Sequence, residues 1–169
     1  HSKYKDVCLN YKLLAGPDWW EHGLVGTIFR FREGPIAMTA DIESMFLQVQ
    51  VPDEDRSAFR FLWRKTTSEP VKILEYQRHV FGARSSPTCA NYALKQVGVD
   101  NQDEFPIAAK AIATNFYMDD FIKSFQTPEE GVKIFKQPKH GFELKKWICN
   151  NEQIQNVIPK ELLSKSSTK

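Results

Sequence analysis

The first regular pattern of apolar positions in the chain has helical spacing. Asp18 and Glu21 are spaced as in a capping box, which predicts the start of a helix. The apolar residues around and after them fall on one helical face: Trp20, Leu24, Val25, Ile28 and Phe29. A Gly-Pro pair at 34–35 ends this pattern. A short apolar run over 36–40 then predicts a strand that leads directly into Asp41.

Two later segments alternate apolar and polar residues, which is the pattern of strands with one buried face. The first segment covers residues 59–64 and the second covers residues 74–80. A polar stretch at 65–70 separates them. The arrangement predicts an antiparallel hairpin.

Helix-start signals precede the remaining helical segments. Ser85-Ser86-Pro87 predicts a helix over 88–96, with serine as the N-cap and proline in the first turn. A second helix is expected over 106–114, followed by a strand-like pattern. Thr127-Pro128-Glu129-Glu130 forms a capping box ahead of a helix over 131–136. Strands and helices mix without a regular β-α-β alternation, which favours an α+β fold with an antiparallel sheet.

Length and composition fit a globular chain with its own core. The chain has 169 residues, of which 41% are hydrophobic and 26% are charged. No apolar run approaches the length of a membrane span, so we expect no membrane partner. Cys8, Cys89 and Cys149 lie far apart without a C-x-x-C pair, which indicates a reducing compartment. The chain begins at His1 without an initiator methionine, as expected for a piece of a longer polypeptide.

Charge is distributed unevenly along the chain. The net charge is only +2, which is too small to indicate a nucleic-acid partner by itself. Residues 131–169 hold eight lysines against three glutamates, whereas residues 17–130 carry a net charge of −5. A basic end beside an acidic centre suits a polyanion and a metal ion, respectively. A solvated lysine-rich face is the simpler interpretation.

The sharpest chemical feature is a pair of adjacent carboxylates within an apolar, aromatic-rich run. Asp119 and Asp120 lie at the centre of residues 116–122. An isolated Asp-Asp pair is typical of a hairpin turn. Here the flanking strand signals place the pair at a hairpin tip, where Asp119 and Asp41 could converge. Oxygen ligands without nearby His or Cys suit Mg²⁺ or Mn²⁺ rather than zinc.

The Tyr117-Met118-Asp119-Asp120 box resembles the signature of reverse transcriptases. The surrounding sequence resembles, more narrowly, the polymerase core of Pao/BEL-type long-terminal-repeat retrotransposons, in order over residues 1–155. The segments that carry this resemblance include Leu9-Asn10, Ala40-Asp41-Ile42-Glu43, Phe61-Leu62-Trp63, Phe81-Gly82-Ala83, Ser85-Ser86-Pro87 and Gly141-Phe142 through Lys146-Trp147. The resemblance implies an RNA-directed DNA polymerase with a palm-type antiparallel sheet, packed helices and part of the fingers.

The resemblance also implies a catalytic role for three carboxylates. Asp41, Asp119 and Asp120 would be catalytic and would bind two Mg²⁺ or Mn²⁺ ions. One ion would activate the primer 3′-hydroxyl, and the other would hold the incoming triphosphate.

Further roles follow from the same resemblance. The residues implied to contact the nucleotide are Ile42, Phe46, Phe81, Gly82 and Lys146, with Phe46 excluding a ribose 2′-hydroxyl and Lys146, or Lys145 in its place, near the leaving pyrophosphate. The residues implied to contact template and primer are Tyr117, Met118, Arg84, Ser86 and Pro87. Without the motif, Phe46 would be an ordinary core residue and Arg84 an exposed arginine.

The implied partners are an RNA or DNA template with a DNA primer, a dNTP, and the remainder of a Pol polyprotein with thumb, ribonuclease H, protease and integrase. Residues 156–169 are expected to form a poorly ordered polar tail. The expected location is intracellular: the cytoplasm, a virus-like particle or the nucleus.

Two other functions remain open from the sequence. The chain could be a catalytically silent remnant that only binds nucleic acid or protein. A carboxylate metal site could also serve a phosphohydrolase.

Overall fold

The computed structural model describes residues 3, 5–17, 23–137 and 141–165. The capping box predicted at Asp18 and Glu21, together with Trp20, lies outside these residues. The chain divides into two compact units. The first unit comprises His1–Pro17 and Phe46–Ala90, and the second comprises Asp18–Met45 and Asn91–Lys169.

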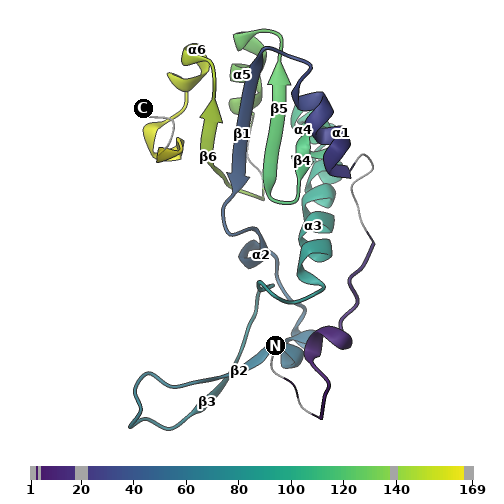
Figure 1. Cartoon of the computed structure of the whole chain (residues 1–169), viewed down its shortest axis with the longest axis vertical. Coiled ribbons are helices and arrows are strands. Elements are labelled where there is room, and N and C mark those ends of the chain that lie inside the picture. Colours follow the sequence, from purple (N-terminus) through teal and green to yellow (C-terminus); the bar gives the residue numbers. More distant parts are fainter. Residues whose placement is uncertain (1–2, 4, 18–22, 138–140, 166–169) are drawn as a thin grey trace. The chain divides into compact units, whose positions relative to one another are not determined.

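The second unit contains a four-stranded antiparallel sheet (Figure 1). Its strands are β1 (Ile36–Ile42), β4 (Phe116–Tyr117), β5 (Asp120–Phe125) and β6 (Leu144–Cys149). They lie in the order β4-β5-β1-β6, so β1 pairs with β5 on one side and β6 on the other. The predicted strand over 36–40 is confirmed and extends two residues further. Strand β6 has no counterpart among the predicted elements.

One face of this sheet forms the core of the second unit. Burial alternates strictly along β1: Ile36, Met38, Ala40 and Ile42 are buried, and the residues between them are half-buried. Side chains from helices α3 (Ser86–Asp100), α4 (Pro106–Asn115) and α5 (Pro128–Phe135) meet the strands here. Leu94, Ala111 and Ile134 line a cavity of about 80 Å³ with Phe121, Trp147 and other apolar residues. The Trp147 ring also contacts the rings of Phe121 and Phe135.

The helices largely follow the sequence signals. They are α1 (Gly23–Phe31), α2 (Met45–Gln48), α3 (Ser86–Asp100), α4 (Pro106–Asn115), α5 (Pro128–Phe135) and α6 (Glu152–Gln155). Short 3-10 helices span η1 (Leu9–Tyr11), η2 (Asp53–Phe59) and η3 (Lys160–Leu162). The expected helix starts at Pro87, Pro106 and Pro128 are confirmed, and α3 runs four residues past its predicted end.

The capping box of α5 forms only in part. Thr127 occupies the N-cap position, yet its side chain makes no capping hydrogen bond. Glu130 instead accepts a hydrogen bond from the backbone N–H of Gln126 at 3.0 Å. The glutamate therefore satisfies one free N–H just before the helix, as the second half of a capping box would.

Helix α1 forms as predicted, but its apolar stripe is not its buried face. Val25 and Phe29 are 67% and 69% exposed, whereas Thr27 is buried. Arg30 anchors the helix by donating a hydrogen bond to the carbonyl of Thr114 at 3.0 Å. Polar contacts and one threonine, rather than the stripe, thus hold α1 within its unit.

The first unit contains the predicted hairpin, but its second strand spans Lys72–Glu75, whereas the sequence pattern placed it over 74–80. Strands β2 (Arg60–Trp63) and β3 (Lys72–Glu75) pair antiparallel, with Arg60 opposite Glu75 and Trp63 opposite Lys72. Most side chains of this hairpin are exposed on both faces. The core of the unit lies instead around Val51, Phe59 and Ala83, with Leu13 and Val80 packed against it.

Residues beyond 155 belong to the folded second unit as far as the structure describes them. Ile158 is buried, Leu163 pairs with Trp147, and the Ser164 N–H donates to the Trp147 carbonyl at 3.0 Å. The structure therefore carries the fold further than the tail expected from residue 156.

The architecture confirms the predicted α+β class with a palm-type antiparallel sheet. Helices of the second unit pack on a sheet whose neighbouring strands are all antiparallel. Within the described part of the chain, no helix has the length and apolar character needed to cross a membrane.

Candidate active site

Strands β1 and β5 bring two of the predicted carboxylates together. Asp41 and Asp120 are direct partners in the antiparallel register, one near the end of β1 and the other at the start of β5. They belong to the face of the sheet opposite the one that carries Met38 and Phe121; Asp41 is half-buried and Asp120 is exposed. Like charges directly opposite each other in a sheet are destabilising, so a cation nearby would stabilise this pair.

Asp119 lies in the two-residue turn that joins β4 to β5. Tyr117 pairs with Asp120, which leaves Met118 and Asp119 as the turn, and Met118 adopts a left-handed backbone with φ of +56°. The carbonyl of Asp119 accepts a hydrogen bond from the Ile42 N–H at 2.8 Å. This hydrogen bond ties the turn to the residue after Asp41. The backbone of Asp119 therefore lies beside the end of β1, close to Asp41, as predicted.

Burial and neighbouring charges shift the pKa of Asp120. Partial burial raises the pKa of Asp120, and the negative charges of Asp119 and Asp41 raise it further. The Lys146 ammonium acts in the opposite direction and lowers it. The excess negative charge at this end of the sheet is thus only partly compensated by the protein itself.

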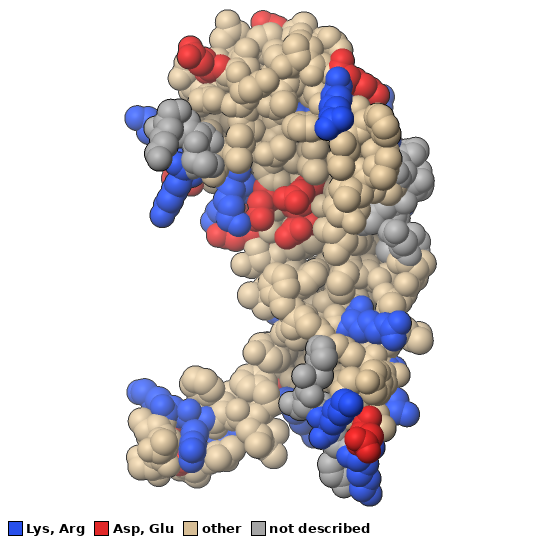
Figure 2. Space-filling view, viewed as in Figure 1, with Lys and Arg blue, Asp and Glu red and all other residues tan. Residues whose placement is uncertain are grey.

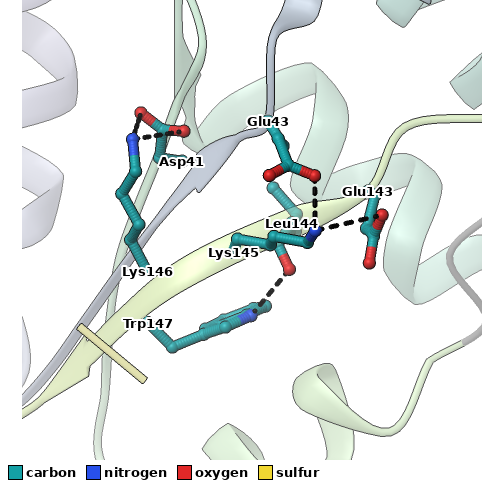
Figure 3. Close-up of polar contacts among 7 residues, drawn as sticks. All are labelled: Asp41, Glu43, Glu143, Leu144, Lys145, Lys146 and Trp147. Carbon is teal, nitrogen blue, oxygen red and sulfur yellow. Dashed lines mark hydrogen bonds and ion pairs between the residues drawn. The ribbon is translucent and has the colours of Figure 1, made fainter. Parts of the chain in front are cut away.

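Lys146 reaches Asp41 because strand β6 contains a bulge. Thr39 pairs with Ile148 and Asp41 with Lys145, so Lys146 and Trp147 together oppose Ala40. Lys146 has a left-handed φ of +54°, and the Trp147 indole N–H donates to the Leu144 carbonyl at 3.2 Å. The Lys146 Nζ lies 3.2 Å from both carboxylate oxygens of Asp41 (Figure 3).

A second charged cluster lies beside this pair and was not found from the sequence. Lys145 forms ion pairs with Glu43 and Glu143, the latter at 3.7 Å (Figure 3). The hydrogen bond to Glu43 is the main cause of a raised pKa of Lys145. The backbone N–H of Glu43 also donates to the Glu143 carbonyl at 3.0 Å. Figure 2 shows acidic and basic side chains gathered at this end of the sheet.

The first unit holds the predicted nucleotide residues Phe46, Phe81 and Gly82. The rings of Phe46 and Phe81 are in contact, with centroids 4.7 Å apart and an interplanar angle of 56°. Gly82 has a φ of +90°, a conformation that favours glycine. The contact between Phe46 and Phe81 was not indicated by the sequence.

Asn10 clamps the loop that contains Gly82. Its side-chain Nδ2 donates to the Gly82 carbonyl at 2.7 Å, and its Oδ1 accepts from the Arg84 N–H at 2.9 Å. Both hydrogen bonds fix the backbone and leave the Arg84 side chain exposed. The family resemblance includes Leu9-Asn10, but nothing in the sequence indicated that Asn10 contacts the loop around Gly82.

Two predicted residues have side chains that point into their own units. Ser86 is fully buried, and its hydroxyl donates to the Val80 carbonyl at 2.8 Å and lies 3.3 Å from Nδ1 of His79. The Ile42 side chain is 1% exposed. The buried side chain of Ile42 is therefore not available for the predicted nucleotide contact, and its N–H is already donated to the Asp119 carbonyl. Pro87 and Tyr117 are half-buried.

The donor chemistry at Asp41, Asp119 and Asp120 fits a divalent ion that prefers oxygen ligands. In the side-chain arrangement of the described residues, however, no three His, Cys, Asp or Glu side chains gather around one metal position. The Asp41 carboxylate instead forms an ion pair with the Lys146 ammonium.

The family model described as "Reverse transcriptase (RNA-dependent DNA polymerase)" matches residues 17–162, which include all three carboxylates and both strands that carry them. The chain belongs to this family, whose members are nucleotidyltransferases that bind a nucleic-acid template and primer and a dNTP and use divalent metal ions. No curated protein matches the chain at a significant level.

Proposed function

We propose that the chain is the RNA-directed DNA polymerase core of a Pao/BEL-type retrotransposon polyprotein. It would transfer a nucleotide from a dNTP to a primer 3′-hydroxyl by a two-metal mechanism. The observation that carries the proposal is the register pairing of Asp41 with Asp120, with Asp119 in the adjoining turn. The order of motifs along the chain supports the narrower retrotransposon assignment.

Asp41, Asp119 and Asp120 would hold two Mg²⁺ or Mn²⁺ ions. Such ions, when bound, activate the 3′-hydroxyl and neutralise the charge that develops on the triphosphate. The contribution of the chain is to keep three carboxylates on one rigid sheet end. The hydrogen bond from the Ile42 N–H to the Asp119 carbonyl serves this purpose, because it ties the turn to β1.

Phe46 would select deoxynucleotides, since an aromatic ring beneath the sugar leaves no room for a 2′-hydroxyl. Its contact with Phe81 supports this role by limiting the positions that the Phe46 ring can take. Gly82 would allow close approach of the backbone to the nucleotide. Lys146 would lie near the leaving pyrophosphate, where a positive charge is favourable.

Template and primer would lie along the residues already assigned to them by resemblance: Tyr117, Met118, Arg84, Ser86 and Pro87. For Ser86 the hydroxyl is engaged within its unit, so it would act by holding the start of α3. The chain would function together with thumb, ribonuclease H, protease and integrase segments of a polyprotein, inside a cell or a virus-like particle.

The test is extension of a DNA primer on an RNA template with Mg²⁺ or Mn²⁺. Wild-type protein is compared with Asp119→Asn and with Glu129→Gln, which removes an exposed carboxylate in the first turn of α5. We expect extension by the wild type and the Glu129 variant, and a loss of at least about 100-fold in Asp119→Asn, since the metals contribute several kcal/mol.

Equal extension by wild type and Asp119→Asn would overturn the assignment of the carboxylates. Binding of primer–template without extension by any of the three proteins would favour a silent nucleic-acid-binding remnant. Hydrolysis of phosphate esters without extension would favour a phosphohydrolase.

A further inference from the structure

Lys146 occupies an unusual backbone position for a lysine. It is the extra residue of the β6 bulge, with φ of +54°, a left-handed conformation that glycine adopts without steric cost. Strained positions of this kind persist where the surrounding structure fixes them. Here the Trp147 side chain is 1% exposed and its indole donates to the Leu144 carbonyl across the bulge.

The bulge determines where the lysine side chain goes. Without the extra residue, strict alternation from Lys145 would direct position 146 toward the buried face of the sheet. With it, the ammonium lies on the opposite face and contacts both oxygens of Asp41 at 3.2 Å. Lys145, the residue before it, forms ion pairs with Glu43 and Glu143 instead (Figure 3). The two lysines therefore serve different carboxylates.

A cation beside the Asp41 carboxylate reduces repulsion from the neighbouring carboxylates. It faces Asp120 directly across the sheet, and Asp119 adds a third negative charge nearby. The Asp41 side chain is 27% exposed, so solvent screens it only in part, whereas the Lys146 side chain is 68% exposed. A flexible, mostly solvated ammonium is well suited to leave, because little packing holds it.

We propose that the Lys146 ammonium is a placeholder cation. It binds Asp41 while no divalent ion is present, and an arriving divalent ion displaces it. This inference rests on the proposed function, because it assumes that Asp41 is a metal ligand.

Displacement makes the metal and the lysine compete for the same carboxylate. The ion pair between Lys146 and Asp41 must break for the metal to bind, so it weakens the apparent metal affinity. A partly exposed ion pair of this type corresponds to a change of roughly two- to fivefold in a binding constant. The effect depends on a positive charge at position 146 and not on a lysine in particular.

The first measurement is Mn²⁺ binding to the 169-residue chain, followed by the loss of the free-Mn²⁺ signal in electron paramagnetic resonance. Wild type is compared with Lys146→Gln, Lys146→Arg and the matched control Lys145→Gln. We expect Lys146→Gln to bind Mn²⁺ about two- to fivefold more tightly than wild type. Lys146→Arg retains the charge and is expected to bind like wild type, and Lys145→Gln to change affinity less than Lys146→Gln.

The second measurement reads the release of the lysine itself. An amine-reactive reagent labels the protein with and without saturating Mg²⁺, and mass spectrometry gives the extent of labelling at each lysine. We expect Mg²⁺ to increase labelling at Lys146 and to leave labelling at Lys145 unchanged, because the ion pairs of Lys145 do not involve Asp41.

The outcomes separate the two proposals. If wild type binds Mn²⁺, Asp41→Asn does not, and Lys146→Gln binds no more tightly than wild type, the placeholder is overturned while the metal site stands. An equal gain in Lys145→Gln and Lys146→Gln also overturns it, since general charge repulsion then suffices. If neither wild type nor Lys146→Gln binds Mn²⁺, both proposals fail.

Discussion

Lys146 shows how a single residue can be retained against its local backbone preference. A non-glycine residue with a left-handed φ is disfavoured by roughly 1–2 kcal/mol relative to its relaxed state. The side chain at this position is the one that neutralises Asp41. We therefore attribute the presence of lysine at position 146 to its ion pair with Asp41 and not to the stability of β6.

This explanation predicts an order of stability between two truncations at position 146. Lys146→Gly and Lys146→Ala both lose the ion pair with Asp41, but only glycine adopts the left-handed conformation freely. We expect Lys146→Gly to exceed Lys146→Ala in free energy of unfolding by about 1 kcal/mol, measured by urea denaturation. Equal stabilities, or a more stable alanine variant, would show that the bulge is not strained.

The Phe46–Phe81 contact leads to a prediction about sugar selectivity. If Phe81 supports the ring of Phe46, then Phe81→Ala should lower the preference for dNTP over rNTP by about two- to tenfold, the range of an aromatic pair. In a Phe46→Val background the same change should have no further effect. The measurement is the ratio of kcat/KM values for the two nucleotides in all four proteins. Additive effects of the two substitutions would contradict a shared role.

At the scale of elements, the start of α3 is tied to the preceding loop by a buried polar pair. His79 is 7% exposed, its Nδ1 lies 3.3 Å from the Ser86 hydroxyl, and its ring meets the edge of Phe59. Burial lowers the pKa of His79 below its ordinary value of 6.5. The folded state therefore favours neutral histidine more than the unfolded state does.

The sign of the resulting pH dependence is defined by this shift. Above pH 6.5 the histidine is neutral in both states, and its contribution to stability is complete. As the pH falls below 6.5 toward the lower folded-state pKa, the unfolded state takes up the proton first and stability is lost. We expect urea denaturation to show this loss in wild type but not in His79→Asn, after subtraction of effects common to both. Parallel pH profiles would contradict the assignment.

The elements that carry their own local signals were predicted correctly from the sequence. Proline and capping residues locate the starts of α3, α4 and α5, and period-two alternation locates the hairpin and its first strand, although the second strand lies at Lys72–Glu75 and not over 74–80. Strand β6 was missed because its bulge interrupts the alternation at Lys145 and Lys146. The exposure of the α1 stripe could not be predicted either, since it depends on which contacts the rest of the unit provides.

The candidate site was predictable in its residues but not in its pairings. The Asp119-Asp120 motif and the strand before Asp41 indicated which carboxylates to expect together. The register of β1 with β5, the ion pair of Lys146 and the clamp by Asn10 all join residues distant in the sequence. Such pairings follow from tertiary packing, which no local pattern encodes.

At the scale of the whole molecule, the family match and the strand register both indicate the sheet end where Asp41 and Asp120 lie. The reverse transcriptase match covers residues 17–162, and within it the register pairs Asp41 with Asp120. The Asn10 clamp and the Phe46–Phe81 contact lie in the other unit, at and beside Gly82. We therefore propose that the carboxylates at the sheet end carry catalysis and that Phe46, supported by Phe81, carries the selectivity for deoxynucleotides.

The most direct test of this account is single-nucleotide incorporation as a function of Mg²⁺ concentration. A DNA primer on an RNA template is mixed with one correct dNTP and an excess of wild-type protein or Asp41→Asn. The account predicts Mg²⁺-dependent addition of one nucleotide by the wild type and a rate at least about 100-fold lower for Asp41→Asn at every Mg²⁺ concentration. Equal rates for the two proteins, or incorporation that does not depend on Mg²⁺, would contradict it.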